Sequence, residues 1–317
     1  MKKTILIISV LGVSGGPIAA CDLCSIYSAA EARGEIGKGF FGGVAEQYTH
    51  FGTLQQDGHK VANEVNQSLD SSISQLFVGY NFSERLGLQF TAPIIYRDFR
   101  RPEGGIIEND TESGLGDVTL TAHYQVFRHE TKHTTLAWTI LGGIKFPTGS
   151  SDRLREETEE EEPLPGEPES GVHGHDLTLG SGSFDGIIGT SLYGRWNRFF
   201  MSASVQYAIR TRGDFEYEFA NDLTWAGGPG MLLLLKDNYT LSLQANVSGE
   251  TKGRDDFNGE TAEDTGITSV FIGPELIFSW GEKLSADLGL DWPVSLHNTA
   301  LQLVPDYRVR AAVTWHF

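Results

Sequence analysis

The sequence predicts an all-β protein, a transmembrane antiparallel up-and-down β-barrel of about twelve strands. Three observations predict it: apolar and polar residues alternate with a period of two, the alternating segments are long, and short connections alternate with long ones. A two-residue period places successive side chains on opposite faces of a strand. Segments of about ten residues or more are long enough to cross a bilayer at a tilt, and bacterial membrane barrels have an even strand number.

The carboxyl-terminal segment shows the alternation most clearly. Along 303–317, the apolar Val313 and Trp315 occupy one face, and the charged Arg308 and Arg310 occupy the other. The same pattern recurs along the chain. The expected strands span 38–50, 70–82, 84–97, 115–128, 133–147, 183–196, 197–212, 216–234, 237–250, 266–280, 282–297 and 303–317.

The connections between these segments alternate in length. Tight turns are expected at 81–84, 196–197, 236–238 and 280–282, and long polar loops at 51–69, 98–114, 148–182 and 251–265. Membrane barrels have short periplasmic turns and longer outer loops. A soluble β-sandwich or barrel would also alternate, but strands of soluble proteins average about five or six residues. The membrane barrel is therefore favoured.

The amino-terminal residues are typical of a secretory signal peptide. Lys2 and Lys3 precede an apolar run over 4–13, and small residues end at Ala20. A run of roughly ten residues is too short to cross a bilayer as a helix. The expected organisation is a signal peptide at 1–20, cleaved after Ala20, a periplasmic segment with a short helix at 21–37, and a barrel of the bacterial outer membrane at 38–317.

The composition is strongly acidic. The chain has 24 Lys and Arg residues against 42 Asp and Glu residues, a formal net charge of −18, and loss of Lys2 and Lys3 with the signal peptide makes it −20. Binders of nucleic acid need a cationic face. Nucleic acid is therefore excluded as the main partner, and membrane lipid and a small solute are expected instead.

The motif Cys21-Asp22-Leu23-Cys24 contains both cysteines of the chain. Four interpretations stay open: a local disulfide, acylation of Cys21 because Ile18 to Cys21 resembles a lipobox, a redox-active dithiol, and half of a site for a soft metal. Haem attachment is excluded because Ser25, and not a histidine, follows the second cysteine.

An acidic loop over 152–176 ends in His173-Gly174-His175-Asp176. Imidazole and carboxylate ligands suit Zn, Cu or Ni, so His173, His175 and Asp176 are candidate ligands of a divalent metal. The alternative is a solvated run of charge with no ligand. No other cofactor is expected.

Inward-facing charged residues of both signs follow from the alternation. A barrel of about twelve strands is narrow, so these side chains either line a small aqueous path or pair across the lumen and close it. The predicted lumen-lining residues are Arg85, His123, Lys145, Arg198, Arg210, Glu218, Asp222, Glu275, Asp287, Asp291, Arg308 and Arg310.

Signatures of catalysis are lacking, so the chain is not expected to be an enzyme. Beyond residue 20 no Gly-x-Ser-x-Gly nucleophile elbow occurs, and no histidine has a serine two positions later, the pattern of the outer-membrane phospholipase. Gly180 to Gly186 is glycine-rich, but it is not a phosphate-binding loop.

Three turn-rich motifs carry a family resemblance: Gly114-Leu115-Gly116-Asp117, Lys145-Phe146-Pro147-Thr148-Gly149, and Gly180-Ser181-Gly182-Ser183-Phe184-Asp185. Over roughly 80–317 the chain resembles the outer-membrane barrels that serve as transporters of the phenol-degradation meta-pathway. The resemblance implies a barrel and the uptake of small, often aromatic, molecules. The last strand also resembles the segment that the barrel-assembly machinery recognises, through Tyr307, Val313, Trp315 and Phe317.

Two functions of different classes follow from the sequence. In the first, small solutes cross the lumen, and the loops 98–114 and 148–182 control access. In the second, the lumen is closed, and the segment with Cys21 and Cys24 binds a periplasmic redox or metal partner. An outer-membrane lipid hydrolase is a third and weaker alternative, because it has no motif in its support.

Overall fold

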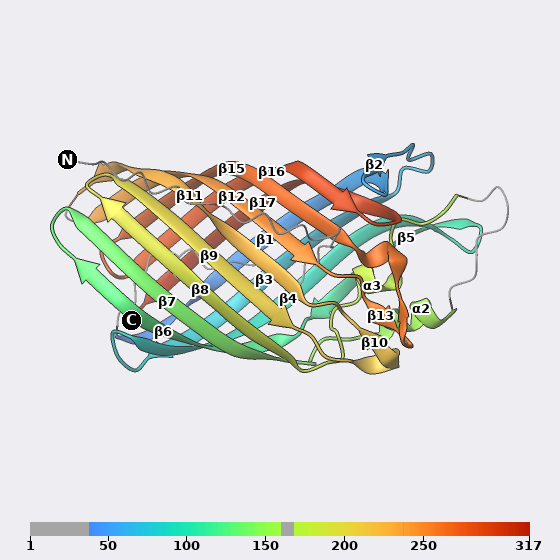
Figure 1. The fold of residues 1–317 in the computed structure, drawn as a ribbon, viewed down its shortest axis with the longest axis horizontal. Coiled ribbons are helices and arrows are strands. Elements are labelled where there is room, and N and C mark those ends of the chain that lie inside the picture. The colour runs from blue at the N-terminus through green and yellow to red at the C-terminus, as the bar shows by residue number, and fades with distance from the viewer. Residues whose placement is uncertain (1–37, 160–167, 237) are drawn as a thin grey trace, which may run out of the picture.

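The computed structural model describes residues 38–159, 168–236 and 238–317 and has the shape of a long cylinder (Figure 1). In these residues, twelve antiparallel strands form one closed barrel, as predicted. The barrel strands are β1 (Gly39–Gln56), β3 (Ser68–Asn81), β4 (Leu86–Glu103), β6 (Val118–Glu130), β7 (Thr134–Phe146), β8 (Asp185–Trp196), β9 (Phe199–Ile209), β11 (Asp222–Leu235), β12 (Tyr239–Lys252), β15 (Ile267–Trp280), β16 (Leu284–Asn298) and β17 (Leu301–His316).

The first and last strands close the barrel. Strand β17 pairs with β1 in an antiparallel register that begins with Phe41 opposite His316 and continues to Gln56 opposite Leu301. An irregularity at Phe51 shifts the register between His50 and Phe51 and again between Phe51 and Thr53. Because the seam is paired along its length, no strand edge of the barrel is left open, which is the condition for burying a sheet in lipid.

The two ends of the barrel differ. The short-turn end carries the connections 82–85, 131–133, 197–198, 236–238 and 281–283. The chain terminates at this end, and the longer connections gather at the opposite, long-loop end (Figure 1). The predicted asymmetry of the connections is therefore present.

Two segments expected as loops are strands. The predicted loop 98–114 forms the end of β4 and the whole of β5 (Ile106–Leu115), which pair with each other. The predicted loop 51–69 contains the end of β1 and the short β2 (His59–Lys60). These extensions were missed because the outer face of a strand is polar beyond the apolar band, so the alternation of polarity fades there.

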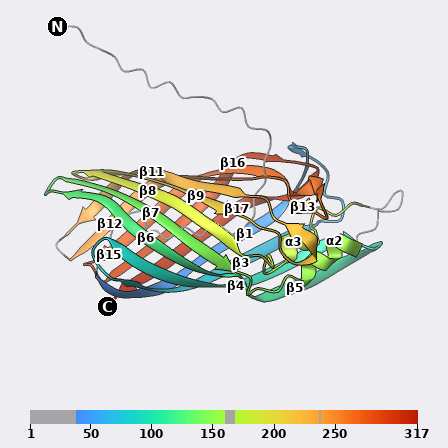
Figure 2. The same ribbon diagram turned by 60° about the horizontal axis from the view of Figure 1, so that its bottom comes forward.

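Small elements cover the long-loop end. They are the 3-10 helices η1 (Asp152–Arg155), η2 (Asp214–Glu216) and η3 (Glu263–Thr265), the one-turn helices α2 (Glu156–Glu159) and α3 (Gly174–Leu177), and a small sheet of β10 (Tyr217–Glu218), β13 (Asp256–Phe257) and β14 (Glu260–Thr261). Both views place α2 and α3 at this end of the barrel (Figures 1 and 2).

The outer wall is apolar. Exposed side chains such as Leu88, Ile140 and Leu243 point away from the barrel, and exposed aromatic residues such as Trp196 and Trp280 lie beside the short turns. Such aromatic residues are typical of the interface between lipid and water. Within the described residues, no helix has the length and apolar character that would let it span a membrane.

Candidate functional site

The inner wall of the barrel is polar. Gln47 of β1, Gln125 of β6 and Gln244 of β12 all face inward and are buried. The Gln244 amide donates a hydrogen bond of 2.8 Å to the hydroxyl of Ser202 on the neighbouring side of the lumen. A buried amide must be hydrogen-bonded or hydrated. An inner wall of this kind suits an aqueous path better than a dry core.

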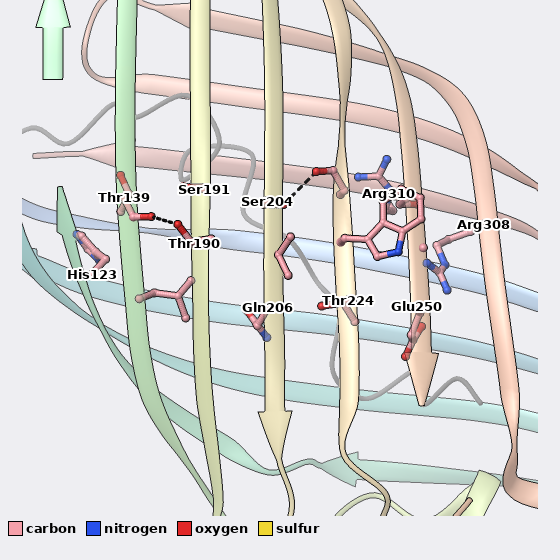
Figure 3. Close-up of a pocket in the computed structure, with 16 residues that line it drawn as sticks. His123, Thr139, Thr190, Ser191, Ser204, Gln206, Thr224, Glu250, Arg308 and Arg310 are labelled. Atoms are coloured by element: carbon pink, nitrogen blue, oxygen red, sulfur yellow. Dashed lines mark hydrogen bonds between the residues drawn. The ribbon is translucent and has the colours of Figure 1, made fainter. Parts of the chain in front are cut away.

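The middle of the lumen holds a cavity, which we name the central chamber. It encloses about 840 Å³ that no atom fills, part of it continuous with the rest of the lumen. Figure 3 shows His123 and Thr139 on one side of it and Glu250, Arg308 and Arg310 on the other. In the described part of the chain, the Ser248 hydroxyl and His123 Nδ1 are buried without a hydrogen-bond partner. A solute or water in the chamber can therefore bond to these atoms.

Charges on the wall of the central chamber are balanced. Arg310 Nε lies 2.6 Å from a carboxylate oxygen of Asp291, and its Nη2 lies 3.3 Å from Glu275. The Arg308 guanidinium lies 4.3 Å from the centre of the Phe271 ring. Both side chains occupy space in the lumen and so narrow it. Because carboxylates pair with Arg310, the wall does not carry charge of one sign only.

The three family motifs converge on one buried ion network near the long-loop end. Lys145 Nζ lies 2.7 Å from Asp117 and 2.7 Å from Asp185, and it also contacts the Ser181 hydroxyl. Asp185 and Asp222 in turn bind Arg210, at 2.9 and 2.7 Å. The motifs lie up to some seventy positions apart in the sequence, and β6, β7 and β8 bring them side by side.

This network also holds the connection between β7 and β8. The Asp117 carboxylate accepts hydrogen bonds from the backbone of Gly149 at 3.0 Å and of Ser181 at 2.9 Å. A Cβ at Gly180 would lie 2.6 Å from both Asp117 Oδ1 and the Gly149 carbonyl oxygen, so this position has room only for glycine. The network therefore fixes both ends of the segment that crosses the mouth.

The later part of this connection, residues 168–180, forms a cap over the lumen, which we name the loop cap. Its Val172 and Leu177 are buried in one cluster with Phe99 of β4. The other members of the cluster are Leu54, Leu69 and Leu303, from β1, β3 and β17. The Gly171 carbonyl accepts a hydrogen bond of 2.9 Å from the Leu303 backbone. Apolar packing and backbone bonds thus close this side of the mouth.

The predicted metal ligands instead hold the loop cap to the opposite side. His175 Nδ1 lies 3.0 Å from Glu157, and His173 Nε2 lies 3.4 Å from Asp264 of η3. The rings of the two histidines stack, with 5.6 Å between centres, and His175 also stacks on Tyr217. Within the described residues, no group of three or more His, Cys, Asp or Glu side chains is arranged to hold a metal ion.

Metal binding by His173, His175 and Asp176 stays a prediction; in this structure the imidazoles pair with carboxylates, His173 with Asp264 and His175 with Glu157 and Asp176. Burial alone lowers the pKa of His175, but the charges of Asp176 and Glu157 outweigh it and hold the pKa well above its ordinary value. Burial alone would raise the pKa of Asp264, but the electrostatic effect of His175 and His173 outweighs it. The pKa of Asp264 therefore lies below its ordinary value. These shifts favour the charged forms of His175 and Asp264.

A second cavity, which we name the outer chamber, lies between the loop cap and the barrel wall. It encloses about 710 Å³ that no atom fills. Ser71 of β3 and Arg97 of β4 line it, together with apolar side chains such as Leu69 and Leu303. On β12, Lys252 lines the outer chamber, and Glu250, the next inward position, lines the central one. The two chambers therefore follow each other along the barrel axis.

Most of the predicted lumen-lining residues face inward, and three do not. The buried or half-buried inward positions are His123, Lys145, Arg210, Asp222, Glu275, Asp287, Asp291, Arg308 and Arg310. The prediction is wrong for Arg85 and Arg198, which are exposed in short turns, and for Glu218, which lies in β10 of the small sheet. A turn interrupts the alternation, so the face of a residue there does not follow from the period.

The side chains proposed as an assembly signal lie on or beside the last strand. Val313, Trp315 and Phe317 are exposed, and Tyr307 is half-buried against Tyr48 and His50 of β1. The Phe317 backbone donates a hydrogen bond of 2.9 Å to the Phe40 carbonyl. Recognition by the assembly machinery stays a prediction.

Several predictions fall outside the described residues. These are the signal peptide 1–20, the segment 21–37 with Cys21 and Cys24, and the central part of the acidic run, 160–167.

Sequence reasoning missed Ser71, Arg97, Trp225 and Glu250, all of which line a chamber. A signal was present for Arg97, because it continues the inward positions of β4 past Ile95. Arg97 is the last residue of the strand predicted over 84–97, next to a predicted loop.

Comparison with protein families confirms the resemblance seen in the sequence. The model of the family described as "Putative MetA-pathway of phenol degradation" matches residues 47–158. This stretch includes the first of the three motifs and the second. Comparison with curated proteins gives no match.

Comparison with solved structures confirms the fold. The chain is similar to an outer membrane channel from Pseudomonas putida F1, with a TM-score of 0.65 and 15% identity over 92% of this chain and 100% of that one. The translocator domain of the autotransporter NalP from Neisseria meningitidis aligns with a TM-score of 0.41 and 13% identity over 89% of both chains. A FadL homologue from Pseudomonas aeruginosa aligns with a TM-score of 0.38 and 10% identity over 95% of this chain and 99% of that one.

Proposed function

We propose that this chain is a channel of the bacterial outer membrane that passes small solutes through its lumen. The observation that carries the proposal is the contrast between an apolar outer wall and a polar inner wall around the central chamber. In lipid, a β backbone must pair all its polar groups, and a closed barrel does so. The predicted signal peptide 1–20 would direct the chain through the periplasm.

We further propose small aromatic or hydrophobic molecules as cargo. The family model matched over 47–158 supports this class. So do the apolar side chains that interrupt the polar wall, Trp225 and Leu141 in the central chamber and Phe51 and Leu69 in the outer one. Aromatic side chains beside a few polar groups are typical of sites for small molecules.

Liposome swelling tests the proposal. Liposomes that contain the purified protein are transferred into isosmotic solutions of phenol, small sugars or amino acids, with protein-free liposomes as the control. We expect swelling above the control with at least one class, and the rank of the rates identifies the preferred cargo. Rates equal to the control for every solute would contradict a channel.

A second candidate function is a closed barrel that binds a partner. The loop cap favours it, because its buried Val172 and Leu177 fill part of the mouth. In this case the segment with Cys21 and Cys24 engages a periplasmic redox or metal partner, and the pore conducts nothing. Planar-bilayer recordings separate the two functions, since stepwise conductance excludes a sealed lumen. Mass spectrometry of the mature amino terminus identifies the state of Cys21.

A further inference from the structure

The short turns of the barrel share one feature of composition. The connections 82–85, 131–133, 197–198, 236–238 and 281–283 each contain one Lys or Arg residue. These residues are Arg85, Lys132, Arg198, Lys236 and Lys283, and all five are exposed. The same connections contain three acidic residues, whereas the whole chain has 42 acidic residues against 24 basic ones. The short-turn end is therefore basic on a protein that is acidic as a whole.

These five cations have no ion-pair partner among the described residues. By contrast, Arg101, Arg153 and Arg254 at the long-loop end lie 2.7, 2.7 and 2.5 Å from carboxylate oxygens. Beside the short turns, Arg128 likewise pairs with Glu130. Uncompensated charges of one sign repel one another, so an anionic layer in contact with the short turns would be attracted to them.

The cations are distributed around the whole rim of the barrel. The turns join β3 to β4, β6 to β7, β8 to β9, β11 to β12 and β15 to β16, which are successive pairs in the closed order of strands. The sixth pair, β17 and β1, meets at the seam. We name this ring of five side chains the cationic collar. It lies at the end of the barrel opposite α2 and α3 (Figure 1).

Aromatic side chains place the cationic collar at the level of lipid head groups. Four of the five cations lie within three residues of an exposed aromatic residue in the sequence. These aromatic residues are Phe82, Trp196, Phe199, Tyr239 and Trp280. Such residues mark the interface between hydrocarbon and water, and long basic side chains reach from there to the head groups. The turns have two to four residues, so the collar projects little beyond that level.

The chemistry of the cationic collar suits a phosphate with net negative charge. A guanidinium binds phosphate through two parallel hydrogen bonds, and an ammonium binds it as a point charge. A zwitterionic lipid brings its own cation next to the phosphate, whereas an anionic lipid does not. Each Lys or Arg near an anionic membrane surface strengthens binding by roughly fivefold.

We propose that the cationic collar is a binding site for the anionic phospholipids of the leaflet that the short turns contact. In membrane barrels this is the periplasmic leaflet. The phosphates bind the five cations, and the acyl chains lie along the apolar outer wall. The site does not involve the lumen, so it holds for a channel and for a closed barrel alike.

Native mass spectrometry of the folded protein, released from a detergent with an uncharged head, tests this proposal. The probes are dioleoylphosphatidylglycerol and dioleoylphosphatidylcholine in equal amounts, because they share their acyl chains and differ in net charge. We expect the anionic lipid to be retained about fivefold or more over the zwitterionic one. Equal retention would overturn the proposal, and an acidic partner protein would then be the alternative occupant of the collar.

Variants locate the site. The triple substitution Arg198→Gln, Lys236→Gln and Lys283→Gln neutralises three successive turns, and we expect it to bring the retention ratio close to one. The matched control, Lys60→Gln, Arg155→Gln and Arg254→Gln, removes the same charge from exposed positions at the long-loop end and should keep the wild-type ratio. Heat-modified mobility on gels confirms that each variant is folded. An unchanged ratio in the turn variant, or an equal fall in the control, would overturn the assignment.

A measurement on the wild-type protein in bilayers gives an independent test. Trp196 and Trp280 lie beside the collar residues Arg198 and Lys283, and brominated acyl chains quench tryptophan fluorescence on contact. We expect brominated phosphatidylglycerol to quench more strongly than brominated phosphatidylcholine at equal mole fraction and low salt. The difference should shrink at high salt, because salt screens exposed charges. Equal quenching by the two lipids at low salt would contradict the collar as a lipid site.

Discussion

At the scale of single residues, Lys145 shows how a short sequence motif acts through space. Its ammonium is buried between Asp117 and Asp185. Asp117 also accepts hydrogen bonds from the backbone of Gly149 and Ser181, in the connection that contains the loop cap, and Asp185 accepts one from the backbone of Thr211. A buried ion pair gives little net stability relative to an apolar pair, but removal of one partner leaves the other charges uncompensated. Loss of the Lys145 ammonium would therefore weaken both the barrel wall and the attachment of the cap.

We expect Lys145→Met to destabilise the folded barrel by about 3–5 kcal/mol, because Asp117 and Asp185 would keep buried negative charges without the ammonium. The heat-induced shift in gel mobility measures the loss. Lys132→Met, in an exposed short turn, is the control and should shift the transition little. If both variants melted together with the wild type, the network would have no structural role.

At the scale of elements, the loop cap is held on one side by apolar packing and on the other by His173 and His175. Because the pKa of His175 is raised in the folded state, its contribution is complete below the ordinary histidine range and is lost as the pH rises through the raised pKa. Because the pKa of Asp264 is lowered, its contribution is lost only as the pH falls through that lowered value. The cap is therefore held most firmly from mildly acidic to above neutral pH.

We expect the channel to open more often as the pH rises through the raised pKa of His175, because neutral His175 no longer attracts Glu157 and Asp176. Single-channel recordings across this range measure the open fraction. His175→Gln should open more often at neutral pH and lose most of the pH dependence. His129→Gln, at an exposed position beside a short turn, serves as the control. A wild-type open fraction that stays constant with pH would contradict this role of the cap.

The elements differ in how well the sequence predicts them. All twelve barrel strands follow from the alternation, because the contrast between lipid and lumen acts on each residue independently of distant contacts. The extension of β4 and β5 beyond the apolar band did not follow, since the polar Asp98 and Arg100 occupy the outer face there and apolar residues no longer mark it. The pairing of the histidines with Glu157 and Asp264 also depends on two separate connections, β7 to β8 and β12 to β15, which no local pattern relates.

At the scale of the whole molecule, the structure is a barrel with a closed wall that is apolar outside and polar inside. Two chambers follow each other along its lumen beneath the loop cap. The sequence predicts the cylinder and the polar lumen. It does not predict the chambers, because their walls combine inward positions from most of the strands, and their volume depends on how Trp225, Arg308 and the loop cap fill the space. In the proposed channel these walls would determine the cargo, so the alternation alone could not identify it.

A pair of substitutions at adjacent positions on β7 tests the central claim most directly. Thr139 is buried and lines the central chamber, whereas the next residue, Ile140, is exposed on the outer wall. We expect the single-channel conductance to fall sharply in Thr139→Trp and to stay at the wild-type level in Ile140→Trp, because only the first indole enters the lumen. Equal conductance in both variants, or a block by Ile140→Trp alone, would contradict a solute path through this barrel.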